Sequence, residues 1–411
     1  MKEAFTRNQR RIFLLCFACY GSAYVGRLNM SAVLNGLATD LSLTDARAGV
    51  FQTVFALIYS LGQIVNGSLV DRISARRYIG TGLLLSAACN ALFGMTSNYT
   101  LLVILWALNG AAQSMLWTPV VKLLTVWFKG PRRDRASFGL SLTMILGHLA
   151  AWGVSGALAS MMSWRYAFFV SAAVVGIAGI AGLVLITDAP APGEDIGTAA
   201  DVAAAPEKSN GNAMPLGRLL GSTGLGLLLL CCICNGFVRD GIVTWAPTIL
   251  ANAQEGLAID STLLTLIIPA INAVGIITVK KCYHVFGDSS RIAVAALMIV
   301  SGILAFLMLP AGMGMIVCAA LMGLCCAANY GVNPMLTTLI PMEYENTGRV
   351  GLVAGLMDCF IYLGSALAGV AVGAMSDSFG WNWVYAAWGI VSMLGAALAF
   401  MSVRGKKNIA A

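Results

Sequence analysis

The chain has 411 residues, of which 59% are hydrophobic and only 10% are charged. A water-soluble protein of this length cannot bury so much apolar surface, so the composition excludes a soluble globular protein and favours an integral membrane protein. The net charge of +7 does not indicate nucleic-acid binding, because most of the basic residues lie in short segments between apolar stretches.

Apolar segments recur along the whole sequence, and one membrane span needs about twenty apolar residues. They predict an all-α integral membrane protein with twelve spans, at 12–34, 48–69, 78–96, 101–127, 137–160, 166–187, 219–250, 261–282, 291–310, 313–341, 349–373 and 382–403.

A polar stretch divides these spans into six and six. It is rich in Ala, Pro, Gly and charged residues and has no apolar periodicity, which is typical of a flexible cytoplasmic linker. We therefore predict an N-terminal six-helix half at 1–187, a linker at 188–218 and a C-terminal six-helix half at 219–411.

The distribution of lysine and arginine predicts the orientation of the spans. Twenty of these residues fall on one predicted side and only Arg47 and Arg165 on the other, so the positive-inside rule makes the first side cytoplasmic. The basic start at 2–11 runs into an apolar stretch too long for a signal peptide, and no cleavable leader is expected. The prediction is a multi-pass protein of a cell inner membrane with both termini in the cytoplasm.

The eleven cysteines lie almost entirely within the apolar segments. Cys16 with Cys19, and Cys231 with Cys234, have a spacing seen in metal sites, but no second group of ligands accompanies them. Small, weakly polar side chains of this kind are common inside helices without any further role. We expect no metal, no disulfide and no cofactor.

Short segments recur between the predicted halves at offsets of 208 to 217 residues. Trp164–Ala167 begins the sixth span and Trp381–Ala386 the twelfth. Gly67–Arg77, after the second span, has a weaker counterpart at Gly275–Lys281, after the eighth. An internal repeat of six helices indicates two similar halves with a substrate site between them.

The loop after the second span has a specific signature. Gly67–Arg77 resembles the G-x-L-x-D-R-x-G-x-R-R loop of the major facilitator superfamily, with Ser74 where glycine is usual. The resemblance implies the major facilitator fold, in which twelve helices form two halves around a central cavity. It also implies a conformational latch made of Gly67, Asp71, Arg72 and Arg76.

Three further stretches resemble the organophosphate:phosphate antiporter family, which includes glycerol-3-phosphate and hexose-phosphate transporters. Residues 20–29 are similar to its Tyr-x-x-x-Tyr-x-x-Arg-Lys-Asn stretch, and residues 113–119 to its Gln-Gly-x-Gly-Trp-Pro-Pro. Residues 238–248 are similar to its Arg-Tyr-Gly-Ile-x-Asp-Trp-Ser-Pro-Thr, and His148 falls where that family has a substrate-site histidine. The resemblance implies transport of a small organic anion.

Three charged groups of that family are missing from this sequence. Leu28 replaces the lysine after the span-one arginine, Gln63 replaces a span-two lysine, and Thr244 replaces a span-seven aspartate. Those groups form charge pairs in the transporters that the chain resembles, so exchange of phosphate esters does not follow directly from the resemblance.

Arg27 and Arg239 lie at comparable places in the two predicted halves, within membrane spans. A charge at the middle of a bilayer costs about 2.5–3.5 kcal/mol on insertion scales, so such residues usually face the protein interior and serve function. Two guanidinium groups around one point suit a phosphate, phosphonate, sulfonate or carboxylate. The alternative is permanent pairing with a buried acid. For Arg239 we do not expect this with Asp240, because adjacent helical residues do not face each other.

Asp358 and His148 are the candidate proton carriers. For Asp358 three interpretations remain open: it binds a proton coupled to transport, it binds a cationic part of the substrate, or it is a structural counter-ion to an arginine. For His148 the sequence allows proton sharing with the substrate, a hydrogen bond to the anion, or a purely structural role.

Other polar and aromatic residues within the spans would supply hydrogen bonds and walls to the same cavity. Asn329 and Asn333 are one turn apart and share a helix face. With the two arginines, the candidate substrate-binding residues are Tyr24, Asn29, Gln113, Trp117, His148, Asn329, Asn333 and Tyr362.

Together these features predict a secondary transporter that moves a small organic anion, such as a phosphate ester or phosphonate, by alternating access. Inorganic phosphate or protons are the expected coupling ions, and a monomer is expected. The first alternative is a proton-coupled symporter of a carboxylate, sugar acid or zwitterion. The second is a non-transporting membrane sensor of the same fold. An enzyme is not expected, because no P-loop, nucleophile elbow or metal-ligand constellation is found.

Overall fold

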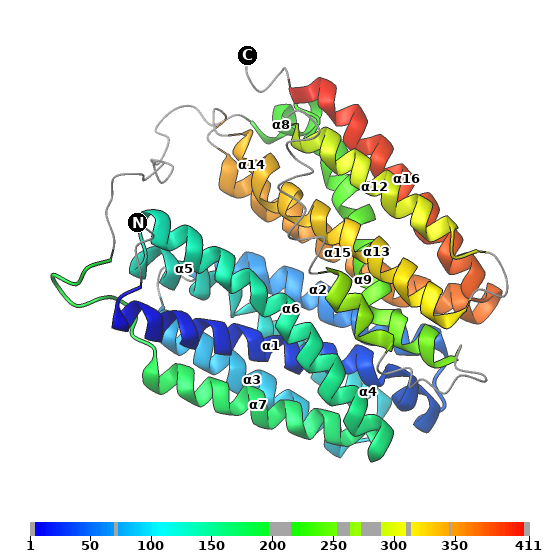
Figure 1. Cartoon of the computed structure of the whole chain (residues 1–411), viewed down its shortest axis with the longest axis horizontal. Coiled ribbons are helices and arrows are strands. Elements are labelled where there is room, and N and C mark those ends of the chain that lie inside the picture. Colours follow the sequence, from blue (N-terminus) through cyan, green and yellow to red (C-terminus); the bar gives the residue numbers. More distant parts are fainter. Residues whose placement is uncertain are drawn as a thin grey trace. The chain divides into compact units, whose positions relative to one another are not determined.

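The computed structural model describes residues 5–69, 73–196, 215–252, 264–272, 289–309, 314–344, 347 and 349–406. All regular elements in these residues are helical, which confirms the all-α prediction (Figure 1). The helices before the linker are α1 (Arg7–Asp40), α2 (Asp45–Leu69), α3 (Ala75–Met95), α4 (Tyr99–Ser114), α5 (Trp117–Trp127), α6 (Gly130–Met161) and α7 (Trp164–Leu185).

The helices after the linker are α8 (Leu216–Ser222), α9 (Leu225–Asn252), α12 (Ser290–Phe306), α13 (Met315–Pro334), a π-helical turn η1 (Met335–Leu339), α14 (Ile340–Met342), α15 (Val350–Phe379), α16 (Trp381–Ser402) and a short 3-10 helix η3 (Val403–Lys406).

Ten helical segments in the described residues are long and apolar enough to cross a membrane. At the predicted ninth span, α12 is a shorter apolar helix of 17 residues. The predicted span at 261–282 lies mostly outside the described residues, so the count of twelve stays a prediction.

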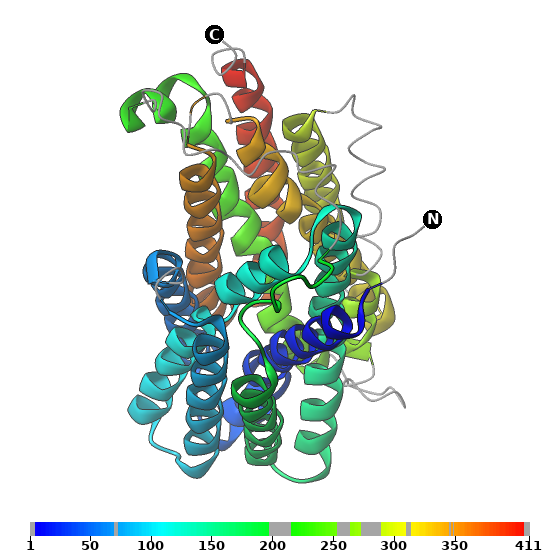
Figure 2. The same cartoon turned by 90° about the vertical axis from the view of Figure 1, so that its left-hand side faces the viewer.

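Two predicted spans are interrupted in the structure. The seventh, predicted at 219–250, begins only at Leu225, because α8 is a separate short helix (Figure 2) and Gly224 after it has a φ of +76°. A glycine readily adopts this left-handed conformation, which ends the helix there. The fourth, predicted at 101–127, is divided into α4 and α5 at Met115–Leu116.

Backbone contacts divide the chain into two compact units. The first unit comprises 1–37 and 58–205, and the second comprises 38–57 and 206–411. The helix α2 therefore contributes its first part to the second unit and its last part to the first unit.

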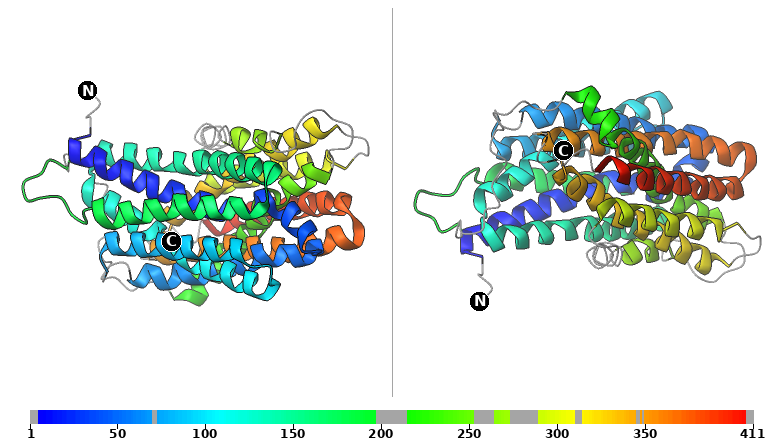
Figure 3. Two further views of the ribbon diagram at one scale, coloured as in Figure 1. Left: turned by 90° about the horizontal axis from the view of Figure 1, so that it is seen from below. Right: turned by 90° about the horizontal axis from the view of Figure 1, so that it is seen from above.

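The first unit is held together by an apolar core and by helices that run side by side. α3 packs along both α7 and α4, and α6 packs along α7 (Figures 1 and 3). The buried core contains residues from α1, α3, α5 and α7, for example Ile12, Leu83, Leu123 and Val175. In the second unit α9 packs against α15 and α12 against α16.

The first part of α2 is fixed to α15 by close backbone contact and by hydrogen bonds. A Cβ on Gly369 would lie 2.4 Å from the backbone oxygen of Gly49, and a Cβ on Gly373 would lie 2.3 Å from that of Asp45. Only glycine permits such an approach of two helices, as small-residue interfaces in membranes show. Gln52 also donates a 2.7 Å hydrogen bond to Ser365.

The carboxylate of Asp377, at the end of α15, accepts hydrogen bonds from the backbone N–H groups of Asp45 (2.9 Å) and Ala46 (2.7 Å). It satisfies two of the unpaired donors at the N-terminus of α2 and places a negative charge at the positive end of its dipole. We call this contact between 45–53 and 365–377 the α2–α15 clasp.

The same polar pair recurs in the two units. In the first unit Ser86 on α3 donates a 2.6 Å hydrogen bond to Asn109 on α4. In the second unit Asn329 on α13 donates a 2.7 Å hydrogen bond to Ser301 on α12. All four side chains are fully buried. The occurrence of a buried serine–asparagine hydrogen bond in both units supports the internal repeat that the sequence predicts.

Ser74, which stands where the superfamily loop has glycine, caps α3. Its Oγ accepts a hydrogen bond from the N–H of Arg77 and donates a 2.5 Å hydrogen bond to Asp188. Asp188 also accepts a 2.8 Å hydrogen bond from the N–H of Arg76, so the first residue of the predicted linker is bound to the start of α3.

We expect Ser74→Ala to destabilise the protein by about 1 kcal/mol, the usual cost of losing an N-cap. The measurement is the thermal unfolding midpoint of the purified protein in detergent. Ser160→Ala is the matched control, because Ser160 is exposed and its only described side-chain hydrogen bond is to Ala157 of its own helix. Equal midpoints for the two variants would contradict the capping role.

Candidate functional site

In the first unit Arg27 lies against the ring of Tyr24, which belongs to a group of packed aromatic rings. The guanidinium carbon of Arg27 lies 4.0 Å from the centroid of the Tyr24 ring, one turn earlier on α1. The Tyr24 ring lies 5.9 Å from His148 on α6 and 5.5 Å from Tyr20. The Tyr20 ring in turn lies 5.1 Å from Trp117 on α5. The structure therefore brings four predicted site residues together, and we call these five residues the α1 cluster.

His148 is buried between the rings of Tyr24 and Trp152. Its Nδ1 lies 3.1 Å from the carbonyl oxygen of Met144 on the same helix. A Cβ on Gly147 would lie 2.5 Å from the Cβ of Tyr24, so α1 and α6 are in direct contact here. The histidine is held in place by packing and by its own helix.

Asn29 and Gln113 belong to a buried network rather than to an open surface. Asn29 is fully buried and donates a 2.8 Å hydrogen bond to Asn90, which donates to the carbonyl oxygen of Gly26 at 3.0 Å. Gln113 donates a 3.2 Å hydrogen bond to Ser86. These positions favour a role in supporting α1 behind Arg27 over direct contact with a ligand.

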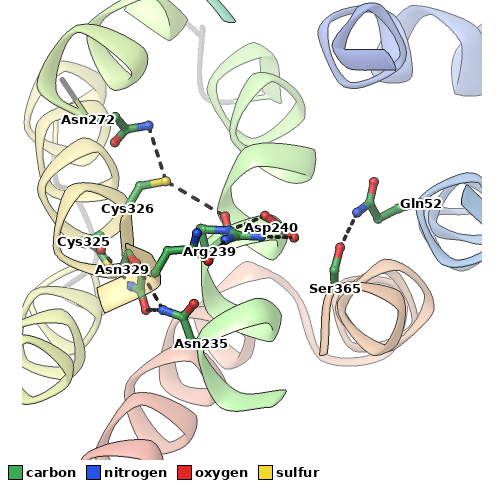
Figure 4. Close-up of polar contacts among 10 residues, drawn as sticks. Gln52, Asn235, Arg239, Asp240, Asn272, Cys325, Cys326, Asn329 and Ser365 are labelled. Atoms are coloured by element: carbon green, nitrogen blue, oxygen red, sulfur yellow. Dashed lines mark hydrogen bonds and ion pairs between the residues drawn. The ribbon is translucent and has the colours of Figure 1, made fainter. Parts of the chain in front are cut away.

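In the second unit, Arg239 on α9 forms an ion pair with its neighbour Asp240 (Figure 4). Its Nε donates to Asp240 Oδ1 at 2.7 Å and its Nη2 to Oδ2 at 2.9 Å. The prediction that these adjacent residues would not pair is therefore wrong. The helical spacing rule describes Cβ directions, whereas the long arginine side chain folds sideways and brings its guanidinium to the neighbouring carboxylate.

Two further residues of α13 contact Arg239. Its Nη1 donates a 2.5 Å hydrogen bond to Asn333, and its guanidinium carbon lies 5.6 Å from the ring centroid of Tyr330. Asn329 is turned away from this group: it is fully buried and bonds to Asn235 and Ser301. Asn333 thus joins the site, while Asn329 lies in helix packing.

Asp358 on α15 lies within electrostatic range of Arg239, which attracts it, and of Asp240, which repels it. Its side chain is half-buried, and it makes no hydrogen bond or ion pair with any described residue. The counter-ion of Arg239 is Asp240 and not Asp358. Tyr362, one turn further along α15, interacts electrostatically with Arg239. We call Arg239, Asp240, Tyr330, Asn333, Asp358 and Tyr362 the Arg239 cluster.

The predicted latch residues are only partly described. Gly67 lies in the last turn of α2, whereas Asp71 and Arg72 lie outside the described residues. Arg76 is in the first turn of α3, where its N–H bonds to Asp188. The latch stays a prediction.

Within the described chain, no group of three or more His, Cys, Asp or Glu side chains has the geometry of a metal site. The ten cysteines in that part of the chain are free thiols, and eight of them are buried.

Comparison with known proteins decides the family. A sequence model of the Major Facilitator Superfamily matches residues 13–350. The chain belongs to this superfamily. Its relatives are transporters or sensors and not enzymes.

One relative is the glycerol-3-phosphate transporter of Bacillus subtilis, 27% identical over 402 residues, with 93% of this chain and 89% of that protein covered. Another is the membrane sensor protein UhpC of Escherichia coli, 22% identical, with 95% and 91% covered. Both relatives agree with the resemblance to the organophosphate:phosphate antiporter family.

The fold of this Major Facilitator Superfamily member is also found in a solved structure. A bacterial homolog of the human lysosomal transporter Spinster, in an inward-facing and occupied conformation, matches with a TM-score of 0.73 at 15% identity. The match covers 99% of this chain and 98% of that one.

Proposed function

We propose that this protein transports a small organic anion with a phosphate or similar group by alternating access, and that Arg27 and Arg239 bind the anionic group. The observation that carries the proposal is one arginine on α1 and one on α9, each beside a tyrosine ring. A protein retains a charged residue within a membrane helix only where it serves function or is paired, because insertion is costly.

The chemistry of each cluster suits an oxyanion. A guanidinium group has five N–H donors in a planar fork, which matches two oxygens of a phosphate or carboxylate. The tyrosine rings beside Arg27 and Arg239 fix these side chains, so less conformational entropy is lost when an anion binds. Relatives named as transporters of phosphorylated compounds favour a phosphate ester as the anion.

The coupling ion is proposed from the remaining titratable groups. Inorganic phosphate would serve an exchanger. A proton carried by Asp358 or His148 would serve a symporter of a carboxylate, sugar acid or zwitterion. This second mode is favoured because Asp358 forms no ion pair with any residue that the structure describes. A sensor function is supported by the relative UhpC. Flux of labelled anion into liposomes separates transport from sensing. We propose a monomer in the inner membrane with both termini in the cytoplasm.

The proposal is tested by thermal stabilisation of the purified protein against inorganic phosphate, glycerol 3-phosphate, a phosphonate, a sulfonate and a carboxylate. An anion present at a hundred times its dissociation constant is expected to stabilise by about 2.7 kcal/mol. We expect Arg27→Ala and Arg239→Ala each to abolish this stabilisation.

The matched control is Arg404→Ala, because Arg404 is exposed in η3. It should respond to the same anion as the unmodified protein does. Stabilisation that persists unchanged in both Arg27→Ala and Arg239→Ala would rule out the paired-arginine site.

A further inference from the structure

Asp240 occupies the edge of the Arg239 guanidinium to which an oxyanion would bind. Its two carboxylate oxygens accept hydrogen bonds from Nε and Nη2 at 2.7 and 2.9 Å, in the bidentate arrangement that arginine makes with carboxylates and phosphates. The other terminal nitrogen, Nη1, donates to Asn333. Three of the five N–H donors of Arg239 are therefore in use before any substrate arrives.

The ion pair is largely removed from solvent, with the Arg239 side chain 10% and the Asp240 side chain 15% exposed. Breaking such a pair leaves an uncompensated charge in a weakly polar environment. An anion can bind to the same edge only if it replaces Asp240 and supplies its own negative charge.

We propose that Asp240 is a resident counter-ion, which the anionic group of the substrate replaces on Arg239 and which returns when the substrate leaves. This inference depends on the proposed function, because it takes Arg239 as a substrate ligand. The counter-ion also determines whether the empty protein can complete the transport cycle. With Asp240 bound, the empty protein has no unpaired guanidinium at this point of the membrane, so it can change conformation without a substrate.

Two results are expected from Asp240→Asn. First, the anion no longer competes with a resident carboxylate. If Arg239 is free in about a tenth of the unmodified molecules, the apparent affinity rises about tenfold. Second, the empty variant has an unpaired arginine within the membrane. The change of conformation by the empty variant should become slow, whereas exchange of one anion for another continues.

The experiment uses the full chain in liposomes loaded with labelled inorganic phosphate or glycerol 3-phosphate. Exchange is measured with the same anion outside, and net efflux is measured with none. We expect the ratio of net efflux to exchange to fall at least about tenfold in Asp240→Asn, because leaving Arg239 unpaired costs the empty protein more than about 1.4 kcal/mol, the energy that corresponds to a tenfold change in rate. Asp240→Glu keeps the counter-ion and should retain net efflux.

Asp195→Asn is the matched control, because it removes the same charge from an arginine–aspartate ion pair, that of Arg132 with Asp195, which lies outside the Arg239 cluster. It should bind the anion and give the same flux ratio as the unmodified protein does.

Three outcomes would overturn the inference while leaving the proposed function intact: unchanged affinity in Asp240→Asn, an unchanged flux ratio in that variant, or equal changes in Asp195→Asn. If Asp240→Asn is unstable without ligand, restored stability in the presence of phosphate supports the inference, and persistent instability contradicts it. Failure of the unmodified protein to bind either anion would instead reject the proposed function for phosphate compounds, and the inference with it.

Discussion

Replacement of Gly369 by alanine is expected to reduce transport at least about tenfold, because the added methyl group overpacks the α2–α15 clasp by more than about 1.4 kcal/mol. A Cβ at this position would lie 2.4 Å from the Gly49 oxygen, 2.5 Å from Thr53 Oγ1 and 2.8 Å from Thr53 N. Two of these three atoms belong to the backbone, so the contact can be relieved only by moving one helix. A conformation that contains the clasp then becomes rare.

The measurement is uptake of labelled anion into liposomes that contain equal amounts of inserted protein. Gly355→Ala is the matched control on the same helix, because a Cβ at Gly355 would meet no atom within 4 Å. It should transport like the unmodified protein. Normal transport by Gly369→Ala would mean that the close approach of α2 and α15 is not needed for the cycle.

Replacement of Arg291 by methionine is expected to destabilise the protein by about 3–5 kcal/mol, the usual cost of breaking a buried ion pair. Arg291 is fully buried near the start of α12. Its Nε forms a 3.0 Å ion pair with Glu343, and its Nη1 donates to the carbonyl oxygens of Thr223 and Ser402. One side chain thus connects the segment before α9 with α12, the segment after α14 and the end of α16.

This loss should be visible as a lower thermal unfolding midpoint in detergent. Arg404→Met removes the same charge from an exposed position near the end of α16 and should shift stability by no more than about 0.5 kcal/mol. The double variant Arg291→Met/Glu343→Gln should recover part of the loss, because it leaves no unpaired carboxylate. Equal midpoints for Arg291→Met and Arg404→Met would show that the buried network contributes nothing.

The fold was largely predictable because the bilayer imposes simple rules on each span. Length and apolar content locate α2, α3 and α7 to within three residues at each end, since a span must cover the hydrocarbon thickness. The interruptions between α4 and α5 and between α8 and α9 were not predictable in the same way. The separation of α8 from α9 depends on the left-handed conformation of Gly224, and nothing in the local sequence distinguishes that glycine from the many others.

The charged residues of the site could be predicted, but not which of them form ion pairs with each other. Arg27, Tyr24 and His148 were found from a family pattern, and the structure brings them together. The pairing of Arg239 with Asp240 depends on how an arginine side chain folds, which helical spacing does not describe. Arg291 is one of the twenty basic residues that the positive-inside rule places on the cytoplasmic side. Its burial depends on acceptors up to 111 positions away.

The α2–α15 clasp has a consequence for how the chain is built. Asp45 and Asp377 are 332 positions apart, yet the start of α2 belongs to the second compact unit. During synthesis α2 is made long before α15, so the face of α2 that contains Gly49 has no α15 partner until late in translation. Contacts of such long range form late and slowly. A chain shortened before α15 would therefore leave the beginning of α2 without its partner.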